Sequence, residues 1–206
     1  MMKKLGNILI GFCLGLLLIP QAGYTQISAK ATTIPNTSEA AEEKARRFFT
    51  DLEVIDQNGN KQRFYSDVLK GRVVLISFIF TNCEFACPML AQRLKQTRSL
   101  MVPAIKDDVW FVSISVDPER DTPEAMKLFA ERQGVDESRW IFLTGDSQNI
   151  NTIIRKLGQW KPDIESHTTL MLAGNTITKH WTRVLPMVPP EGIAQQMRSL
   201  VEETPG

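Results

Sequence analysis

Residues 73–88 read VVLISFIFTNCEFACP, and this stretch decides the fold. Its first half, Val73–Phe80, is a run of apolar residues with the small Ser77 among them, and many of its members are β-branched or aromatic. Such a run predicts a strand that is buried on both faces of a sheet. The second half contains Cys83 and Cys87 and ends in a proline. Because proline suits the first turn of a helix, we expect a helix over Pro88–Met101, with Cys87 near its N-cap and Cys83 in the loop before it.

The rest of the chain alternates apolar runs with amphipathic segments. We expect an N-terminal hairpin at 49–60 with its turn at Asn58-Gly59, strands at 109–116 and 140–143, helices at 121–133 and 148–157, a second hairpin at 168–181 turning at Gly174-Asn175, and a final helix at 190–203. This alternation predicts an α/β domain whose sheet is covered on both faces. A cysteine turn between a buried strand and a helix resembles thioredoxin. We therefore expect a thioredoxin-like three-layer domain with a central mixed sheet flanked by helices and an N-terminal hairpin extension.

The N-terminal part differs in composition from the rest. Two lysines precede an apolar segment, 8–19, which is shorter than the roughly 20 residues of a membrane-spanning helix. We interpret 1–24 as a cleavable signal peptide, with an uncleaved membrane anchor as the alternative. Residues 25–43 are small and polar and predict a flexible linker, which places the folded domain at 44–206. The protein is then exported, to the periplasm or another extracytoplasmic space, either free or anchored to the inner membrane.

The charge balance excludes one class of partner. The 206 residues carry 24 Lys and Arg against 23 Asp and Glu, a net charge of +1. The sequence has no basic run and no basic helix with interleaved aromatic residues. Nothing in it therefore indicates nucleic-acid binding.

Cys83 and Cys87 are the cysteines of the expected domain, since Cys13 lies in the N-terminal apolar segment. Two cysteines are too few for a disulfide framework in a domain this large. Backbone N–H groups and the dipole at a helix start favour a thiolate, and thiolates are soft ligands suited to Cu(I) or zinc. Three residues separate the pair, where thiol–disulfide exchange usually uses two, and the longer link leaves room for a metal. A redox-active pair and a pair of buried structural thiols remain as alternatives.

The two histidines of the chain differ in position. His167 directly precedes the strand expected at 168–172, whose start faces the cysteine turn in a thioredoxin-like sheet. Neutral imidazole is a good donor beside two thiolates, so we take His167 as the third ligand. His180 is interpreted as a surface residue without a role. Four of the methionines scattered along the domain are interpreted as core fillers rather than ligands: Met89, Met126, Met171 and Met187.

Three motifs in this order resemble the SCO/SenC family of copper chaperones. They are Phe80-Thr-Asn-Cys83-Glu-Phe-Ala-Cys87-Pro-Met, Val112-Ser-Ile-Ser-Val-Asp117-Pro-Glu-Arg-Asp121-Thr-Pro and His167-Thr-Thr-Leu-Met-Leu. The likeness runs from about Arg46 to Val201. One departure is Glu84, which stands where many members carry a proline.

The resemblance implies one copper ion, Cu(I) or Cu(II), bound by Cys83, Cys87 and His167, with Asp117 near the site. It implies a metallochaperone that delivers copper to the copper centre of a cytochrome c oxidase, or reduces the cysteines of that centre, without needing catalytic turnover. The expected partner is the copper-bearing oxidase subunit or another copper chaperone, and the expected state is a monomer. The alternative is a thiol–disulfide oxidoreductase, with Cys83 and Cys87 as the catalytic redox pair, that acts on a periplasmic or membrane partner without copper transfer. Asp121 is interpreted as a helix cap.

Overall fold

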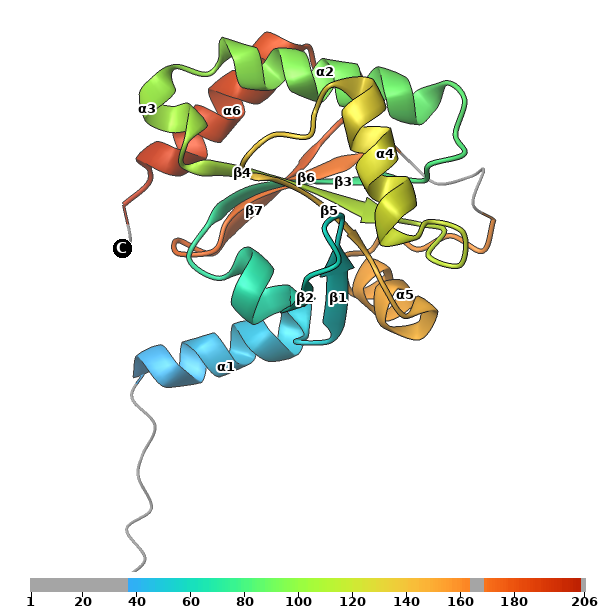
Figure 1. The fold of residues 1–206 in the computed structure, drawn as a ribbon. Helices are drawn as coiled ribbons and strands as arrows, with labels where there is room; N and C mark the ends of the chain where they lie inside the picture. The colour runs from blue at the N-terminus through green and yellow to red at the C-terminus, as the bar shows by residue number, and fades with distance from the viewer. Residues whose placement is uncertain (1–36, 164–168, 205–206) are drawn as a thin grey trace, which may run out of the picture. The chain divides into compact units, whose positions relative to one another are not determined.

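The computed structural model describes residues 37–163 and 169–204. Within this part, seven strands form one sheet in the order β2-β1-β5-β4-β3-β6-β7 (Figure 1). The strands are β1 (Glu53–Asp56), β2 (Lys61–Arg63), β3 (Val73–Ile79), β4 (Val109–Ser115), β5 (Trp140–Thr144), β6 (Met171–Asn175) and β7 (His180–Val184). The helices are α1 (Thr37–Phe49), the π-helix η1 (Phe64–Leu69), α2 (Ala86–Leu100), α3 (Pro103–Lys106), α4 (Pro123–Gln133), α5 (Ser147–Lys156) and α6 (Pro190–Glu202).

The centre of the sheet is the pair β3 and β4. They run parallel in register from Val73 opposite Val109 to Ile79 opposite Ser115. Strand β5 continues the parallel part beyond β4, and β6 pairs antiparallel with β3, so the sheet is mixed. Every residue of β3 is buried, which confirms the doubly buried strand predicted from its apolar run.

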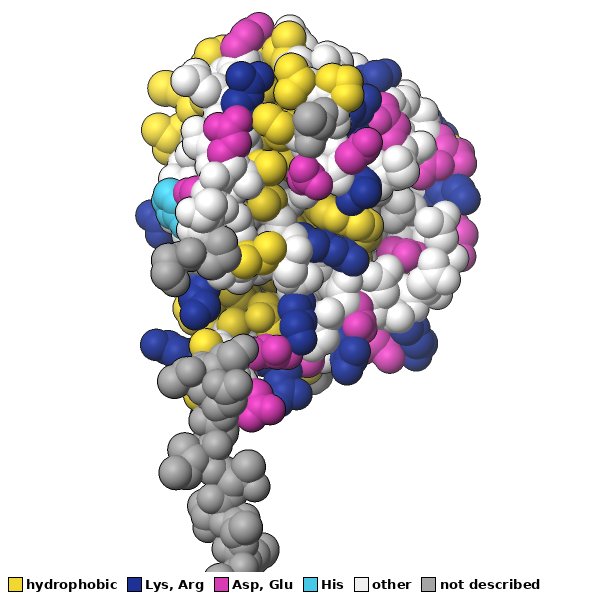
Figure 2. Space-filling view, turned by 90° about the vertical axis from the view of Figure 1, so that its left-hand side faces the viewer, with side chains coloured by type: hydrophobic (Ala, Val, Ile, Leu, Met, Phe, Trp, Pro, Cys, Tyr) yellow, Lys and Arg dark blue, Asp and Glu magenta, His cyan; other side chains and the backbone are white. Residues whose placement is uncertain are grey.

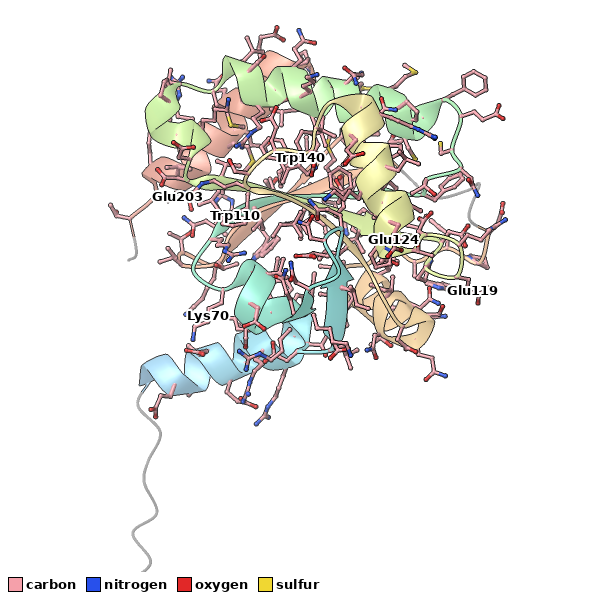
Figure 3. The ribbon with its side chains drawn as sticks, in the orientation of Figure 1. Lys70, Trp110, Glu119, Glu124, Trp140 and Glu203 are labelled. Atoms are coloured by element: carbon pink, nitrogen blue, oxygen red, sulfur yellow. The ribbon has the colours of Figure 1, made fainter. Side chains whose placement is uncertain are left out.

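Helices cover both faces of this sheet (Figure 1). Neighbouring residues of β3 point in opposite directions: Leu75 packs in the core with α2, α4 and α6, and Ile76 packs in the core with α1, η1 and α5. Trp140 belongs to the first of these cores (Figure 3), where its Nε1 donates to Oγ of Ser113 over 3.1 Å. The predicted α/β three-layer domain with a mixed sheet and an N-terminal hairpin, β1–β2, is confirmed.

The N-terminal boundary of the fold differs from the expected one. The linker was expected to continue to Glu43, but α1 already begins at Thr37. Glu43 forms ion pairs with Arg46 and Arg47 on the same helix. At the end of α1, the buried ring of Phe49 packs against Tyr65 and Trp181, in the same core as Ile76. A polar, alanine-rich segment is therefore helical because its last turn packs on the domain, which its composition alone does not indicate.

The turn of the second hairpin was also predicted at the wrong place. Gly174 and Asn175 belong to β6, and the turn lies at Thr176–Lys179. Gly174 is opposite Trp181 in the register, and a Cβ on Gly174 would lie 2.3 Å from that ring. The glycine thus makes space for a cross-strand tryptophan, while the Asn175 carboxamide accepts the backbone N–H groups of two turn residues.

None of the described helices is long and apolar enough to cross a membrane. The segment expected to be a signal peptide or anchor, 1–24, lies outside the described residues. On the face drawn in Figure 2, basic and acidic side chains are interspersed, as the net charge of +1 suggests.

Candidate metal centre

The two cysteines lie where the central strand β3 passes into α2. Cys83 is half-buried in the connecting loop, Cys87 is fully buried, and both are free thiols. The amide N–H of Cys87 donates to Sγ of Cys83 over 3.2 Å. The first N–H groups of a helix have no acceptor within the helix, so the Cys83 sulfur satisfies one of them. The sheet and the helix start therefore bring the two predicted sulfur residues together.

The helix begins earlier than expected. It starts at Ala86, which makes Cys87 its second residue and Pro88 its third. Proline is tolerated there because the N–H it lacks would have no partner in the first turn. Cys87 is thus in the first turn of the helix, near the N-cap residue Phe85 as expected, and its side chain enters the core with Leu90 and Leu94.

Burial dominates the electrostatics of Cys87. Burial raises the pKa of the Cys87 thiol well above its ordinary value, although hydrogen bonding to the Phe80 backbone opposes this change. At Cys87 burial therefore outweighs the effect expected of the helix start, and it favours the protonated thiol in the free protein. A metal ion that binds this sulfur displaces its proton, so metal binding at Cys87 is coupled to proton release.

Asp121 has a different role from the expected helix cap. The cap of α4 is Thr122, whose hydroxyl accepts the N–H of Ala125. Asp121 is 1% exposed, and its Oδ1 accepts the Thr81 N–H at 3.0 Å and the Thr81 hydroxyl at 2.6 Å. Its Oδ2 accepts the Ser115 hydroxyl at 2.6 Å. Burial raises the pKa of the Asp121 carboxyl, against the lowering effect of these donors.

Asp117 is buried at the end of β4, and its carboxylate accepts Arg120 Nε at 2.5 Å. Within the described part of the chain it forms no hydrogen bond with either cysteine. It connects to the cysteine loop indirectly, because its N–H donates to Ser115 Oγ, which in turn donates to Asp121. A position of Asp117 near a bound metal stays a prediction.

His167 lies outside the described residues, so its position relative to the cysteines stays a prediction as well. Its neighbourhood in the sequence is described. In β6, Leu172 is opposite Ile76 of β3, and because the pair is antiparallel, β6 begins on the side of β3 that leads to Cys83. Thr169 also lines a pocket of about 220 Å³ together with Ala86 and Met89 of α2. Thr169, the first described residue after His167, therefore lies beside the helix that carries Cys87.

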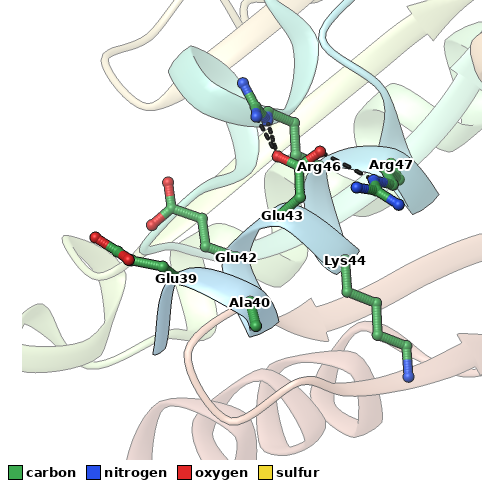
Figure 4. Close-up of a pocket in the computed structure, with 7 residues that line it drawn as sticks. All are labelled: Glu39, Ala40, Glu42, Glu43, Lys44, Arg46 and Arg47. Carbon is green, nitrogen blue, oxygen red and sulfur yellow. Dashed lines mark hydrogen bonds and ion pairs between the residues drawn. The ribbon is translucent and has the colours of Figure 1, made fainter. Parts of the chain in front are cut away.

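The described residues contain no group of three or more His, Cys, Asp or Glu side chains arranged to hold a metal ion. Cys83 and Cys87 supply two soft donors, and this donor set fits copper or zinc once a third ligand is added. The described residues that line a hollow along α1 (Figure 4) all belong to that helix, where Arg47 Nε lies 2.9 Å from Glu43. These are solvated ion pairs of one helix surface, and they hold no soft donor.

Two of the four methionines contradict the interpretation as core fillers. Met126 and Met171 are buried in the core as expected, but Met89 is 69% exposed and Met187 is 83% exposed. Phe85, between the cysteines, is 75% exposed. The cysteine turn therefore has an apolar rim that the sequence patterns did not predict. His180 is a surface residue, as expected, and its Nδ1 lies 2.5 Å from Glu203 Oε1.

Residues 40–201, almost the whole described domain, match the SCO1/SenC family. The chain belongs to this family. The resemblance inferred from the three motifs is therefore confirmed over a longer segment than those motifs cover.

Individual SCO1/SenC relatives agree with this assignment. The chain is 40% identical to the SCO1 protein homolog of Bacillus subtilis over 93 residues, which are 45% of this chain and 48% of the relative. It spans about half the length of the curated relatives it matches. BsSco, a member of the Sco family of cytochrome c oxidase assembly proteins, is 30% identical with a TM-score of 0.61, covering 76% of this chain and 94% of BsSco. Copper-bound ScoI of Bradyrhizobium japonicum is 26% identical with a TM-score of 0.56, covering 72% and 96%.

Sequence reasoning missed two residues near the cysteine turn of this chain, Thr81 and Ser115. Both donate to the buried carboxylate of Asp121. Thr81 is 40 residues from Asp121 in the chain, so no local pattern joins them. The signal that could have found the pair is topological: the ends of adjacent parallel strands, β3 and β4, meet at one edge of the sheet.

Proposed function

We propose that this chain holds one copper ion through Cys83, Cys87 and His167 and transfers it to the copper-bearing subunit of a cytochrome c oxidase or to another copper chaperone. The observation that carries the proposal is the pair of free thiols, joined by the 3.2 Å contact at the strand–helix turn. Membership of the SCO1/SenC family supports it. Copper is the cargo in this proposal, so no catalytic turnover is required.

The unequal burial of the two sulfurs suggests an order for ligand exchange. A docked partner can reach the half-buried Cys83 from the loop side, whereas Cys87 is enclosed by the core. A partner thiolate therefore replaces Cys83 first, and release from Cys87 follows. When the sulfur of Cys87 loses copper it regains a proton, because burial raises the pKa of its thiol, and this protonation favours release.

The test compares the two histidines. Reduced protein receives one equivalent of Cu(I) and is then challenged with a chromophoric Cu(I) chelator. Wild type and the His180→Ala variant should retain copper, whereas His167→Ala should lose it to the chelator. His180 is the matched control, because it is exposed and pairs with Glu203 rather than with the cysteine loop. Equal retention by His167→Ala and wild type contradicts the three-ligand site.

A thiol–disulfide reductase is the second candidate, and the same difference in burial favours it. The Cys83 thiolate attacks a partner disulfide and forms a mixed disulfide, releasing one partner thiol. Cys87, deprotonated as it reacts, attacks the Cys83 sulfur, which releases the second partner thiol and leaves Cys83–Cys87 oxidised. A Cys87→Ser variant should accumulate the mixed disulfide, and His167→Ala should keep the activity. Absence of the trapped species in Cys87→Ser contradicts this candidate.

The location and assembly state belong to the same proposal. We propose an exported, monomeric protein whose residues 1–24 act as a cleaved signal or as a tether to the inner membrane. The composition of this segment supports the proposal. N-terminal sequencing of the protein recovered from its native host separates the two forms, since a tethered protein retains the apolar residues 8–19.

A further inference from the structure

The carboxylate of Asp121 is one of the most firmly anchored groups near the cysteine turn. Besides its three side-chain hydrogen bonds, its backbone N–H donates to the Asp117 carbonyl at 2.9 Å. Its backbone carbonyl accepts the hydroxyl of the buried Thr144 at 2.6 Å. Asp121 is therefore fixed by β5 and by the end of β4, independently of the cysteine loop.

From this fixed point the carboxylate holds one residue of the cysteine loop. Thr81, two residues before Cys83, donates both its backbone N–H and its hydroxyl to Asp121 Oδ1. The same loop also contains a backbone hydrogen bond from the Cys83 N–H to the Phe80 carbonyl, at 3.3 Å. The contact between Thr81 and Asp121 lies where the chain leaves β3, two residues before the Cys83 sulfur whose position the loop sets.

A buried carboxylate is an expensive way to stabilise a fold, because desolvation opposes its charge. Asp121 does not cap α4, since Thr122 does. The buried carboxylate at position 121 is better explained by a need for two strongly accepting oxygens at this place than by helix capping. One oxygen receives two donors from Thr81, and the other receives the Ser115 hydroxyl.

We propose that Asp121 is the positioning residue of the cysteine site: by holding Thr81 it sets the Cys83 sulfur against the N–H of Cys87. It touches neither sulfur and acts through the loop. The proposal concerns the cysteine pair that both candidate functions use, and only its copper arm rests on the proposed function.

The chain offers a matched pair of variants for the test. Thr81→Val and Ser115→Ala each remove a hydroxyl that donates to Asp121 at 2.6 Å, but only Thr81 belongs to the cysteine loop. Thr81→Ser keeps the hydroxyl, and Asp121→Asn keeps an oxygen that can accept from Thr81. These two variants serve as rescue controls. Asp121→Ala removes the carboxylate altogether. If Asp121→Ala fails to fold, Thr81→Val still tests the proposal.

Two measurements on the full chain separate positioning from stability. The first is the dithiol–disulfide equilibrium of Cys83 and Cys87 in glutathione buffers, with thermal unfolding measured in parallel. A looser loop closes the disulfide less readily, so Thr81→Val should shift the equilibrium toward the dithiol by about tenfold, or about 30 mV. The second is Cu(I) affinity, which should fall about 10- to 100-fold, as for other residues that orient metal ligands.

Ser115→Ala should lower the unfolding temperature but leave the dithiol–disulfide equilibrium and the Cu(I) affinity near those of wild type. Thr81→Ser and Asp121→Asn should also keep both quantities near their wild-type values. A wild-type dithiol–disulfide equilibrium in Thr81→Val overturns the proposal, as does an equal shift in Ser115→Ala. The equilibrium is measured without metal. A wild-type chain that retains no copper would therefore contradict the copper function and leave the positioning role to be decided by the redox arm.

Discussion

The amide N–H of Cys87 points at the Cys83 sulfur, with 3.2 Å between the nitrogen and Sγ. This contact makes the two cysteines chemically unequal. Cys83 accepts a donor from the helix start and lies partly open to solvent, whereas the Cys87 side chain is enclosed in the core. Any reagent or partner that enters from solvent meets Cys83 first.

Alkylation should therefore proceed in a fixed order. In reduced protein at pH 8, iodoacetamide should modify Cys83 at least about tenfold faster than Cys87, because burial both shields Cys87 and raises the pKa of its thiol. The Cys87 rate should keep increasing with pH beyond the range of an ordinary thiol. Timed quenching and peptide mass spectrometry measure both rates. The single variants Cys83→Ser and Cys87→Ser provide the reference for each sulfur, and equal rates would contradict the described burial.

The apolar rim of the cysteine turn should affect transfer more than binding. Phe85→Ser and Met89→Ser remove exposed apolar side chains beside the cysteines. Exposed apolar groups of this kind contribute to partner contacts, so copper transfer to the purified partner domain should slow about tenfold while Cu(I) retention stays unchanged. Leu128→Ser is the matched control, since Leu128 is an exposed apolar residue on α4. Unchanged transfer in both rim variants would remove this rim from the docking surface.

The sequence predicted well those parts of the fold that depend on local patterns. The run Val73–Phe80 is apolar except for Ser77, and the resulting strand is buried throughout. Gly134 follows α4 in the left-handed region at φ 64°, where glycine is favoured. The cysteine pair was also predictable, because a strand, a loop and an early helical proline place both sulfurs at one turn.

The features that the sequence did not predict depend on contacts between distant segments. Helix α1 has the composition of a linker, and its position in the fold depends on Phe49, which packs against Trp181, 132 positions later in the chain. Asp121 looks like a helix cap until Thr81, on another strand's end, is brought to its carboxylate. Met89 is an apolar residue of the kind usually found in cores, but its side chain is exposed at the start of α2. His167 stays a prediction, since it lies outside the described residues.

The contact between Gly174 and Trp181 predicts a specific loss of stability. A Cβ at position 174 would lie 2.3 Å from the Trp181 ring, and that ring also packs on Phe49 with 4.9 Å between centroids. Gly174→Ala should therefore lower the free energy of unfolding by about 1–3 kcal/mol through overpacking. Urea unfolding measures the change. In a Trp181→Ala background the same substitution should have almost no further effect, and an equal loss in both backgrounds would show that the ring is not the cause.

The ion pair between Arg63 and Asp67 predicts a pH-dependent contribution to stability. Hydrogen bonds from Arg63 lower the pKa of Asp67 to about 2; the larger effect comes from the Arg63 side chain and the smaller from its backbone N–H. The distances are 3.0 Å from Nε and 2.7 Å from the backbone nitrogen to Asp67 Oδ2. Because the folded pKa is below the unfolded one, the contribution is present above the ordinary carboxyl pKa and is lost as the pH falls through about 2.

Asp67→Asn should accordingly lower stability at pH 7, and this difference from wild type should shrink as the pH approaches 2. Since both side chains are exposed, 1 M salt should also reduce it. Urea unfolding at several pH values measures the effect. Asp107→Asn is the control, because Asp107 is exposed and its side chain forms no ion pair or hydrogen bond within the described residues. A difference between Asp67→Asn and wild type that stayed constant from pH 7 to pH 2 would show that the substitution acts through packing at η1 rather than through the charge of the carboxylate.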